Sequence, residues 1–396
     1  MAEYEVRTLG PDDVEAALVV RADAFANPPD DVQRRVVRQR LERGGSSGIS
    51  VDGRLAGMLT VHPLAQFFGG RSVPMGGVAS VAVPVEFRGR GIAPVLLGAA
   101  IESMRDAGQV ISTLHPATAG FYRRLGWELA GTFPTCTLPI RSLASLPPGE
   151  PERLRPAGPA DLALLRETYA RAAPERAGWI DRPEWFWDHA FRTGREGYTV
   201  LACEAPDGDS VDGFALYTQT PRPVVGYDIE VSELVAVDAT TAVTLWRAIG
   251  SFAAQAETVT TVGAVGALLP FLLPDQDVRE TFRGDWMTRL VDAPAAIAAR
   301  GYEPAVTASV HLDVRDPIAP WNEGRFVLQV GDGAATLAAG GTGEVQLGVH
   351  ALSAIYTGYA SALDLASIGA LHGPVEACRA LDAVFAGPTP STLDYF

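Results

Sequence analysis

The sequence has 396 residues, of which 47% are apolar and 20% are charged. This length exceeds what one hydrophobic core usually serves, so two or three domains are expected, and the composition excludes a disordered chain. The formal net charge of −15 argues against a nucleic-acid partner, which would need a basic surface to neutralise phosphates. The acidic balance fits a cationic partner, although acidic surfaces also serve solubility alone.

Residue types that are absent or scattered exclude further chemistry. No lysine occurs, which excludes Schiff-base chemistry and lysine nucleophiles. Cys136, Cys203 and Cys378 are far apart and odd in number, so we expect reduced thiols and no metal site. The acidic start lacks the pattern of a signal peptide, which favours a cytoplasmic location. Residues 258–274 are uncharged but short and interrupted by glycine and proline, which predicts buried core and no membrane span.

The first 140 residues alternate helical and strand patterns, which predicts an α/β (α+β) domain. A helix is expected to begin at Asp12-Asp13, and residues 48–61 are typical of two strands joined at Asp52-Gly53. Residues 73–83 form the next expected strand, with a bulge at glycines 76 and 77. A helix at 93–107, a strand at 110–114, a short helix at 119–125 and a last strand after Gly126 complete the expected domain.

Residues 146–159 contain five prolines and two glycines, the composition of a linker. Beyond them we predict a helix at 161–173 and strands at 198–205, 211–218 and 234–237, followed by a helix at 241–257. The triplet Val235-Ala236-Val237 repeats Val81-Ala82-Val83, each ahead of an expected helix. The second copy lacks a glycine-rich turn, which indicates a degenerate duplicate of the first domain, unless the likeness is chance.

A third α+β unit is expected from about residue 300. Its predicted strands are 306–314, 324–330, 336–338 and 344–349, and its predicted helices are 351–359 and 375–385. The chain then ends in Tyr395-Phe396 rather than in polar residues. Because termini are usually disordered unless held, an aromatic end suggests that this terminus docks onto the protein.

The sequence most able to carry chemistry is Arg88-Gly89-Arg90-Gly91, between an apolar strand and a helix. Two glycines let successive N–H groups converge, and the helix start adds unsatisfied donors and a positive dipole end. Such a turn suits a pyrophosphate. It is neither a Rossmann loop, since that glycine spacing is absent, nor a P-loop, since the chain has no lysine.

This turn, continued by Ile92, Ala93 and Pro94, resembles motif A of the GNAT acetyltransferases, which has the pattern Arg/Gln-x-x-Gly-x-Gly/Ala. The resemblance implies acetyl-CoA as donor, bound by this loop. It also implies that the backbone of Val81, Ala82 and Val83 follows the pantetheine arm and polarises the thioester carbonyl. Backbone donors aimed at a developing oxyanion are a large term in acyl transfer.

The stretch from Ala119 to Trp127 resembles a second GNAT motif, in which a helix brings a tyrosine to the departing sulfur. Tyr122 would then be the general acid, since a tyrosine pKa near 10 lies within about two units of a thiol pKa near 8.5. Packing of an apolar helix face is the alternative reading of this tyrosine. By the same resemblance, Ala117 and Thr118 would contact the cofactor, through their backbone only.

The three-part layout, the stretch Trp286 to Asp292 and the aromatic end resemble the Eis-like (enhanced intracellular survival) proteins over essentially the whole chain. The resemblance implies tandem GNAT domains, the second degenerate, and a C-terminal domain similar to sterol carrier proteins. We place these domains at residues 1–145, 150–295 and 300–396. It also implies a homohexamer.

In that family the C-terminal carboxylate, here that of Phe396, enters the active site as general base. Docking of the terminus for packing alone is the alternative.

The expected reaction is acetyl transfer from acetyl-CoA to a primary amine of a cationic small molecule, an aminoglycoside-like compound or a polyamine. Asp23 and Asp394 are the carboxylates expected to attract it. Acetylation of protein lysines or N-termini, and non-catalytic binding of acyl-CoA or lipid, remain alternatives.

Overall fold

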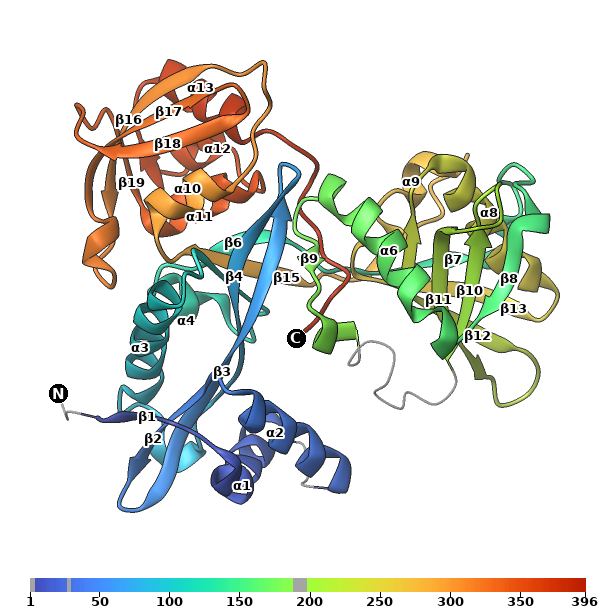
Figure 1. Ribbon diagram of the computed structural model, residues 1–396, viewed down its shortest axis with the longest axis horizontal. Coiled ribbons are helices and arrows are strands. Elements are labelled where there is room, and N and C mark those ends of the chain that lie inside the picture. Colours follow the sequence, from blue (N-terminus) through green and yellow to red (C-terminus); the bar gives the residue numbers. More distant parts are fainter. Residues whose placement is uncertain (1–3, 27–29, 188–197) are drawn as a thin grey trace.

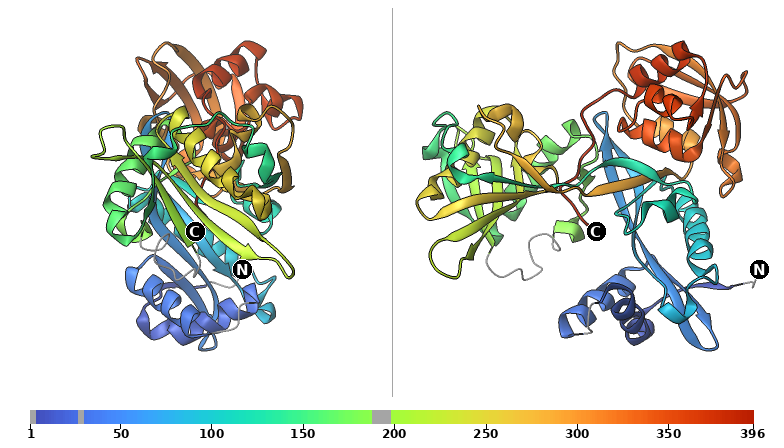
Figure 2. Two further views of the ribbon diagram at one scale, coloured as in Figure 1. Left: turned by 90° about the vertical axis from the view of Figure 1, so that its right-hand side faces the viewer. Right: turned by 180° about the vertical axis from the view of Figure 1, so that it is seen from behind.

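The computed structural model describes residues 4–26, 30–187 and 198–396. The chain forms three bodies, each built on its own sheet (Figure 1). The long strands β3 and β4 belong to the first body and run through the middle of the molecule. The last residues leave the third body and return to lie between the first two, as the front view (Figure 1) and the view from behind (Figure 2) show. The chain therefore brings its end back to its first domain.

The first sheet has the strand order β1-β2-β3-β4-β5-β15-β6, with β9 paired to β3. Its strands are β1 (Val6–Thr8), β2 (Ser46–Val51), β3 (Arg54–Phe68), β4 (Arg71–Ala82), β5 (Ile111–Leu114), β6 (Glu128–Thr132), β9 (Ile180–Asp181) and β15 (Asp285–Leu290). Its helices are α1 (Val14–Phe25), α2 (Asp31–Arg43), α3 (Ile92–Asp106) and α4 (Ala119–Arg123). Helices α1 and α2 share a core with Met58 and Ala82 on one face, and α3 packs with Leu59 and Val78 on the other.

The second sheet has the order β14-β7-β13-β12-β11-β10-β8. Its strands are β7 (Thr135–Pro139), β8 (Leu154–Ala157), β10 (Tyr198–Glu204), β11 (Val211–Pro221), β12 (Tyr227–Ala236), β13 (Ala256–Val262) and β14 (Arg279–Phe282). The helices of this body are α5 (Ile140–Leu143), α6 (Leu162–Ala172), α8 (Ala239–Gly250) and α9 (Leu269–Leu272).

The first two sheets exchange one strand each. Strand β7 follows β6 in sequence but lies between β13 and β14, while β15 follows β14 but lies between β5 and β6. With these two strands exchanged, both sheets have the same order and the same parallel pair, β4 with β5 and β12 with β13. Strand β15 is buried within the first sheet, with Trp286 and Arg289 at 0% exposure, although it follows the second body in sequence.

The third sheet has the order β18-β17-β16-β19-β20. Its strands are β16 (Ala308–Arg315), β17 (Gly324–Gly331), β18 (Ala334–Ala339), β19 (Val345–Gly348) and β20 (Leu371–His372), with helices α10 (Ala293–Ala299), α11 (Val349–Thr357), α12 (Ala362–Ser367) and α13 (Val375–Phe385). Its core is continuous with the first body, since Ile111 and Leu352 belong to one cluster. A fully buried ion pair between Arg289 and Asp316, 2.6 Å long, joins the two.

Short 3-10 turns complete the elements. They are Pro11–Asp13, Val85–Phe87, Pro151–Arg153, Pro159–Asp161, Ala173–Glu175, Ser251–Ala254, Gly263–Gly266 and Pro320–Asn322.

Several sequence predictions of elements are confirmed and several are wrong. The hairpin turn at Asp52-Gly53 is present, and both residues have positive φ, as a type I′ turn requires. The bulge predicted at glycines 76 and 77 is wrong, because β4 keeps its register with β3 there and shifts opposite Leu59 instead. The predicted helix 241–257 ends at Gly250, and residues 256–262 form β13.

Two further predictions need correction. Residues 154–157, predicted as linker, form edge strand β8. Residues 258–274, predicted as buried core, are only partly so, since Val259 is buried but Phe271 is 85% exposed.

Candidate active site

Strands β4 and β5 pair only briefly and then separate. Their parallel register covers Met75 to Gly77 against Ile111 to Thr113, whereas β4 continues to Ala82. Beyond Gly77, no strand of the described residues pairs with β4 on its β5 side. An opening of this kind between two parallel strands offers backbone donors and acceptors to a ligand that enters beside them.

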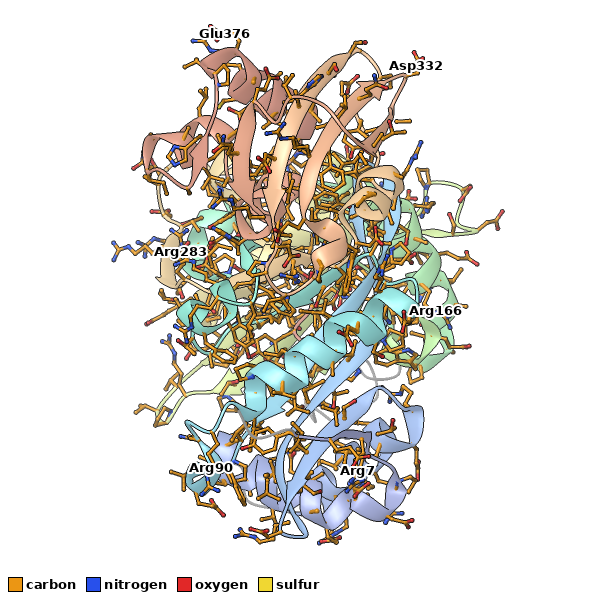
Figure 3. The ribbon with its side chains drawn as sticks, turned by 90° about the vertical axis from the view of Figure 1, so that its left-hand side faces the viewer. Arg7, Arg90, Arg166, Arg283, Asp332 and Glu376 are labelled. Atoms are coloured by element: carbon orange, nitrogen blue, oxygen red, sulfur yellow. The ribbon has the colours of Figure 1, made fainter. Side chains whose placement is uncertain are left out.

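The Arg/Gly turn ends β4 and begins α3. Gly89 and Gly91 have φ of +76° and +82°, a backbone region that side chains disfavour. Gly91 is the N-cap of α3, and among the described residues no side-chain hydrogen bond caps the free N–H groups of its first turn. Arg90 lies at this end of α3 (Figure 3). Uncapped donors, glycines and two exposed arginines together suit a pyrophosphate.

The stretch that leads into this turn is irregular. Ser80 has φ of +54°, and the pairing of β4 with β3 slips by one residue beside it. This bulge turns the backbone of Val81 to Val83 relative to the earlier part of β4. These are the residues predicted to follow the pantetheine arm.

Tyr122 lies on α4 with 9% of its surface exposed, packed edge-on against Phe121 and Trp127. Burial, and then the nearby Tyr395, raise its pKa to about 12. The hydroxyl therefore keeps its proton at all physiological pH values. Ala117 and Thr118, just before this helix, are exposed, and Thr118 occupies the N-cap without a side-chain bond.

The last residues of the chain run between the first two bodies. Two backbone hydrogen bonds hold the start of this tail: the N–H of Thr132 donates to the carbonyl of Pro390, and the N–H of Ser391 donates to the carbonyl of Ala177. The N–H of Ala264, from the second body, donates to the carbonyl of Thr392 at 2.8 Å. Leu393 is buried in the second core. The path of the tail is thus fixed on both sides.

Asp394 anchors the tail through a buried ion pair. Its carboxylate accepts two bonds from Arg182, at 2.8 and 3.1 Å, and Arg182 also donates to Glu233 at 2.8 Å. All three side chains are at most 6% exposed. Burial lowers the pKa of Arg182, but the two carboxylates outweigh burial and raise it well above its usual value. Asp394 is therefore already paired, contrary to its expected role in attracting a cationic substrate.

The tail ends where β4 and β5 separate. A Cβ added to Gly77 would lie 2.7 Å from the ring of Phe396, so the absence of a side chain there makes room for that ring. His115, directly after β5, is surrounded by Tyr395 at 4.3 Å, Phe133 at 5.4 Å and Phe396 at 5.6 Å between ring centroids. Burial lowers the pKa of His115 to about 4, and a hydrogen bond to the backbone of Asp394 opposes this shift only in part.

Several predicted site residues lie near the end of β4. The Arg/Gly loop follows β4 and begins α3, Tyr122 shares a hydrophobic cluster with Val78, Val81 and Val83, and the ring of Phe396 lies at Gly77. Tyr395 lies beside His115, with 4.3 Å between ring centroids, and is the lesser cause of the raised pKa of Tyr122. Asp23 lies apart, exposed, and accepts a bond from the N–H of Val85 at 3.1 Å.

Family comparisons agree with this architecture. Residues 5–130 and residues 178–290 each match an acetyltransferase (GNAT) domain, and residues 293–393 match a sterol carrier protein domain. The chain is 31% identical to an uncharacterized N-acetyltransferase of Streptomyces coelicolor over 327 residues, which are 79% of this chain and 77% of that protein. It is 29% identical to the N-acetyltransferase Eis of Mycobacterium tuberculosis over 342 residues, 80% of this chain and 79% of Eis.

A solved GCN5-related N-acetyltransferase from Anabaena variabilis superposes with a TM-score of 0.91 at 27% identity, covering 100% of both chains. The chain belongs to the Eis-like GNAT acetyltransferases. The predicted fold class is confirmed: tandem GNAT domains and a sterol-carrier-protein-like domain, all mixed α and β. The donor of this superfamily is acetyl-CoA.

The second GNAT domain of this Eis-like chain closes the position that the first leaves open. Helix α8 begins after Asp238, whose carboxylate accepts a bond from the N–H of Thr241 at 2.7 Å. A side chain therefore occupies the donors that α3 leaves free, and its negative charge would repel a phosphate. This agrees with the interpretation of the second copy as degenerate.

Two residues of the site were missed by sequence reasoning. His115 directly follows a predicted strand, a position where side chains often serve function, and this signal was available. Arg182 had no such signal, because its partners Glu233 and Asp394 are 51 and 212 residues away. In the described parts of this Eis-like chain, no helix has the length and apolar character needed to cross a membrane.

Proposed function

We propose that this Eis-like chain transfers acetyl from acetyl-CoA directly to a primary amine of a small molecule. Tyr122 would act as general acid and the carboxylate of Phe396 as general base. One observation carries the proposal: the tail delivers the ring of Phe396 against Gly77, where β4 and β5 separate, and Tyr122 packs in one cluster with the next residue of β4, Val78.

On the donor side, Arg88, Gly89, Arg90 and Gly91 would hold the pyrophosphate, with the first turn of α3 from Ile92 to Pro94. The uncapped helix start and the two positive-φ glycines support this assignment. The N–H groups of Val81 to Val83 would donate to the thioester carbonyl oxygen, where negative charge develops. Ala117 and Thr118, exposed beside α4, would contribute backbone contacts.

The carboxylate of Phe396 would remove the proton that an alkyl amine carries at neutral pH. The freed nitrogen pair then forms the C–N bond as the C–S bond breaks, the sulfur takes the proton of Tyr122, and the second proton that the nitrogen loses restores the Tyr122 hydroxyl. An α-carboxyl group has a pKa near 3.5 in water, which is low for a base. The ring of Phe396 lies 5.6 Å from that of His115, between centroids, so the carboxylate would act from an aromatic part of the site.

Tyr122 would give its proton to the departing sulfur. Its raised pKa widens the gap from a free thiol near 8.5, which costs driving force in water. A coenzyme A thiolate in the same buried place would also be disfavoured, which would raise the pKa of the thiol. The difference between the pKa of Tyr122 and that of the thiol would then be smaller than in water. The acid and its acceptor are then matched by a shared environment.

The class of the acceptor amine follows less directly from the site. A cationic, aminoglycoside-like or polyamine acceptor remains a prediction from family resemblance and net charge. Asp394 is committed to Arg182 and cannot serve it. A homohexamer is likewise a prediction from resemblance, which light scattering would test.

Release of coenzyme A thiol from acetyl-CoA in the presence of different amines tests the function. Polyamines, aminoglycosides, other small primary amines and lysine peptides would be compared. Release with small amines but not with peptides is expected. Release with peptides alone would favour a protein acetyltransferase, and no release with any amine would favour a non-catalytic acyl-CoA or lipid-binding protein.

A further inference from the structure

Three arginines converge on the face of the first sheet that α1 and α2 cover. Arg21 of α1 and Arg40 of α2 both donate to the hydroxyl of Ser80, the Arg40 bond being 2.8 Å long. Arg43, at the end of α2, lies over the ring of Trp185 at 4.2 Å. Arg21 and Arg40 are half-buried. Within residues 4–26, 30–187 and 198–396, none of the three forms an ion pair with a carboxylate.

This arrangement is electrostatically unfavourable without a negative partner. Burial, and then the neighbouring guanidiniums of Arg21 and Arg43, lower the pKa of Arg40 to about 10. Other buried arginines of the chain are compensated: Arg182 and Arg289 by carboxylates, and Arg300 by two backbone carbonyls. Arg21 and Arg40 share a single neutral hydroxyl. Two half-buried guanidiniums beside a third, exposed one at Arg43 are costly unless something balances their charge, so the missing charge points to a ligand.

The cluster lies beside the point where Phe396 ends. Ser80 follows Gly77 by three residues on β4, a separation of about 10 Å at the usual rise of a strand. His62 pairs with Gly77 across β3 and β4, and its ring lies 5.6 Å from that of Trp185, over which Arg43 is placed. Ala82, on the same strand, packs with α1 and α2 rather than with α3. The three arginines therefore line the side opposite α3, within reach of a small molecule whose amine meets Phe396.

We propose that the acceptor carries an anionic group, a carboxylate or a phosphate, in addition to its primary amine, and that Arg21, Arg40 and Arg43 bind this group. Guanidinium groups match both anions with paired hydrogen bonds, and the Ser80 hydroxyl can add a donor. This inference rests on the proposed acetyl transfer for the role of the amine. The net charge of the chain suggested a polycationic acceptor, whereas the three arginines favour an amine that also bears an acidic group. The charge of the residues that contact the acceptor matters more for its binding than the net charge of the chain.

Matched acceptors test the inference through thiol release. Glucosamine is compared with glucosamine 6-phosphate, and amino acid amides with the corresponding free amino acids. The anionic member of a pair is expected to have at least about tenfold higher kcat/KM, since hydrogen bonds between charged groups are the stronger class. In Arg40→Gln the ratio within a pair should fall about tenfold. In Arg35→Gln, exposed on the same helix, the ratio should stay as in the wild type.

Calorimetry with inorganic phosphate provides a readout that does not need turnover. The protein is first saturated with coenzyme A, so that the Arg/Gly loop is occupied. Phosphate should bind to the wild type and to Arg35→Gln but not to Arg40→Gln. An unchanged unfolding temperature of Arg40→Gln shows that this variant is folded. If no amine is acetylated, the proposal of acetyl transfer fails, and phosphate binding alone decides whether the three arginines form an anion site. Phosphate binding that Arg40→Gln leaves unchanged, or equal kcat/KM within the pairs, would overturn it.

Discussion

Tyr122 illustrates how burial sets a residue's chemistry. Its pKa of about 12 leaves the hydroxyl protonated, which suits a donor to sulfur and rules out a role as base. The same site holds His115, whose pKa of about 4 keeps it neutral. At this scale the sequence could identify Tyr122 by its motif, but it could not foresee either shift, because both depend on aromatic neighbours from the distant C-terminus.

Replacing Tyr122 by Phe should remove the acid and keep its packing. We expect kcat to fall by about 10²–10⁴-fold, the usual contribution of general acid catalysis, with the Kd of acetyl-CoA unchanged. Since a raised pKa extends the protonated form upward in pH, wild-type kcat should show no loss from this group up to pH 10. Stopped-flow thiol release and calorimetry measure both quantities. A kcat within threefold of wild type would remove Tyr122 from the mechanism.

His115 should make the fold sensitive to acid. Its pKa is lower in the folded protein than the usual 6.5, so its contribution is full above pH 6.5 and is lost as pH falls toward 4. At 1.36 kcal/mol per pH unit, about 2 kcal/mol should be lost by pH 5. Urea unfolding of wild type and His115→Gln at pH 7 and 5 measures the difference. The exposed His372→Gln is the control, and an equal pH response in all three would refute the assignment.

Helices α3 and α8 occupy equivalent places in the two GNAT domains and differ at one end. Gly91 is the N-cap of α3 and has no side chain to bond the free N–H groups of that helix. In α8 the carboxylate of Asp238 accepts a hydrogen bond from the N–H of Thr241. A single capping residue thus decides which helix can receive a phosphate. This contrast was visible in the sequence, because turn and helix signals are local and need no knowledge of the fold.

Two glycines of α3 provide a matched test. Gly91→Ala forces a side chain into φ of +82° and should weaken acetyl-CoA binding by about tenfold or more through a distorted loop. Gly98→Ala, in the helix interior with nothing within 4 Å of the added carbon, should leave binding unchanged and stabilise the fold by about 0.5–1 kcal/mol. Calorimetry and urea unfolding check both. Equal acetyl-CoA affinities in the two variants would contradict the loop assignment.

The whole molecule is held together by pieces that leave their own domain. Strands β7 and β15 are exchanged between the GNAT domains, and the tail from the third body bonds to both. The strand exchange was not predictable from sequence, because hydrophobic alternation shows that a segment is a strand but not which sheet accepts it. Docking of the tail was expected from its aromatic end, but not its hydrogen bonds to both GNAT domains. Local elements such as α3 and β16 followed from their patterns. The pairing of Arg182 with Asp394 required the assembled fold.

The ion pair between Arg182 and Asp394 should position the tail. Asp394→Asn removes one of the two carboxylates that balance the buried guanidinium of Arg182. Breaking a buried ion pair should lower the free energy of unfolding by about 3 kcal/mol. We also expect kcat to fall while the Kd of acetyl-CoA is kept, since the loop is distant from the tail. Arg166→Gln breaks an exposed pair with Glu184 and should cost less than about 1 kcal/mol. Similar stability losses in both variants would show that burial does not strengthen the tail's anchor.

The most direct test of the mechanism is extension of the chain beyond Phe396. Two glycines added there convert the terminal carboxylate of Phe396 into an amide, and an N-terminal addition of the same length is the control. With the best acceptor, kcat should fall by at least about 100-fold, as for loss of a general base, while acetyl-CoA binds as before. An extended chain that turns over within twofold of the control would contradict a catalytic role for the Phe396 carboxylate.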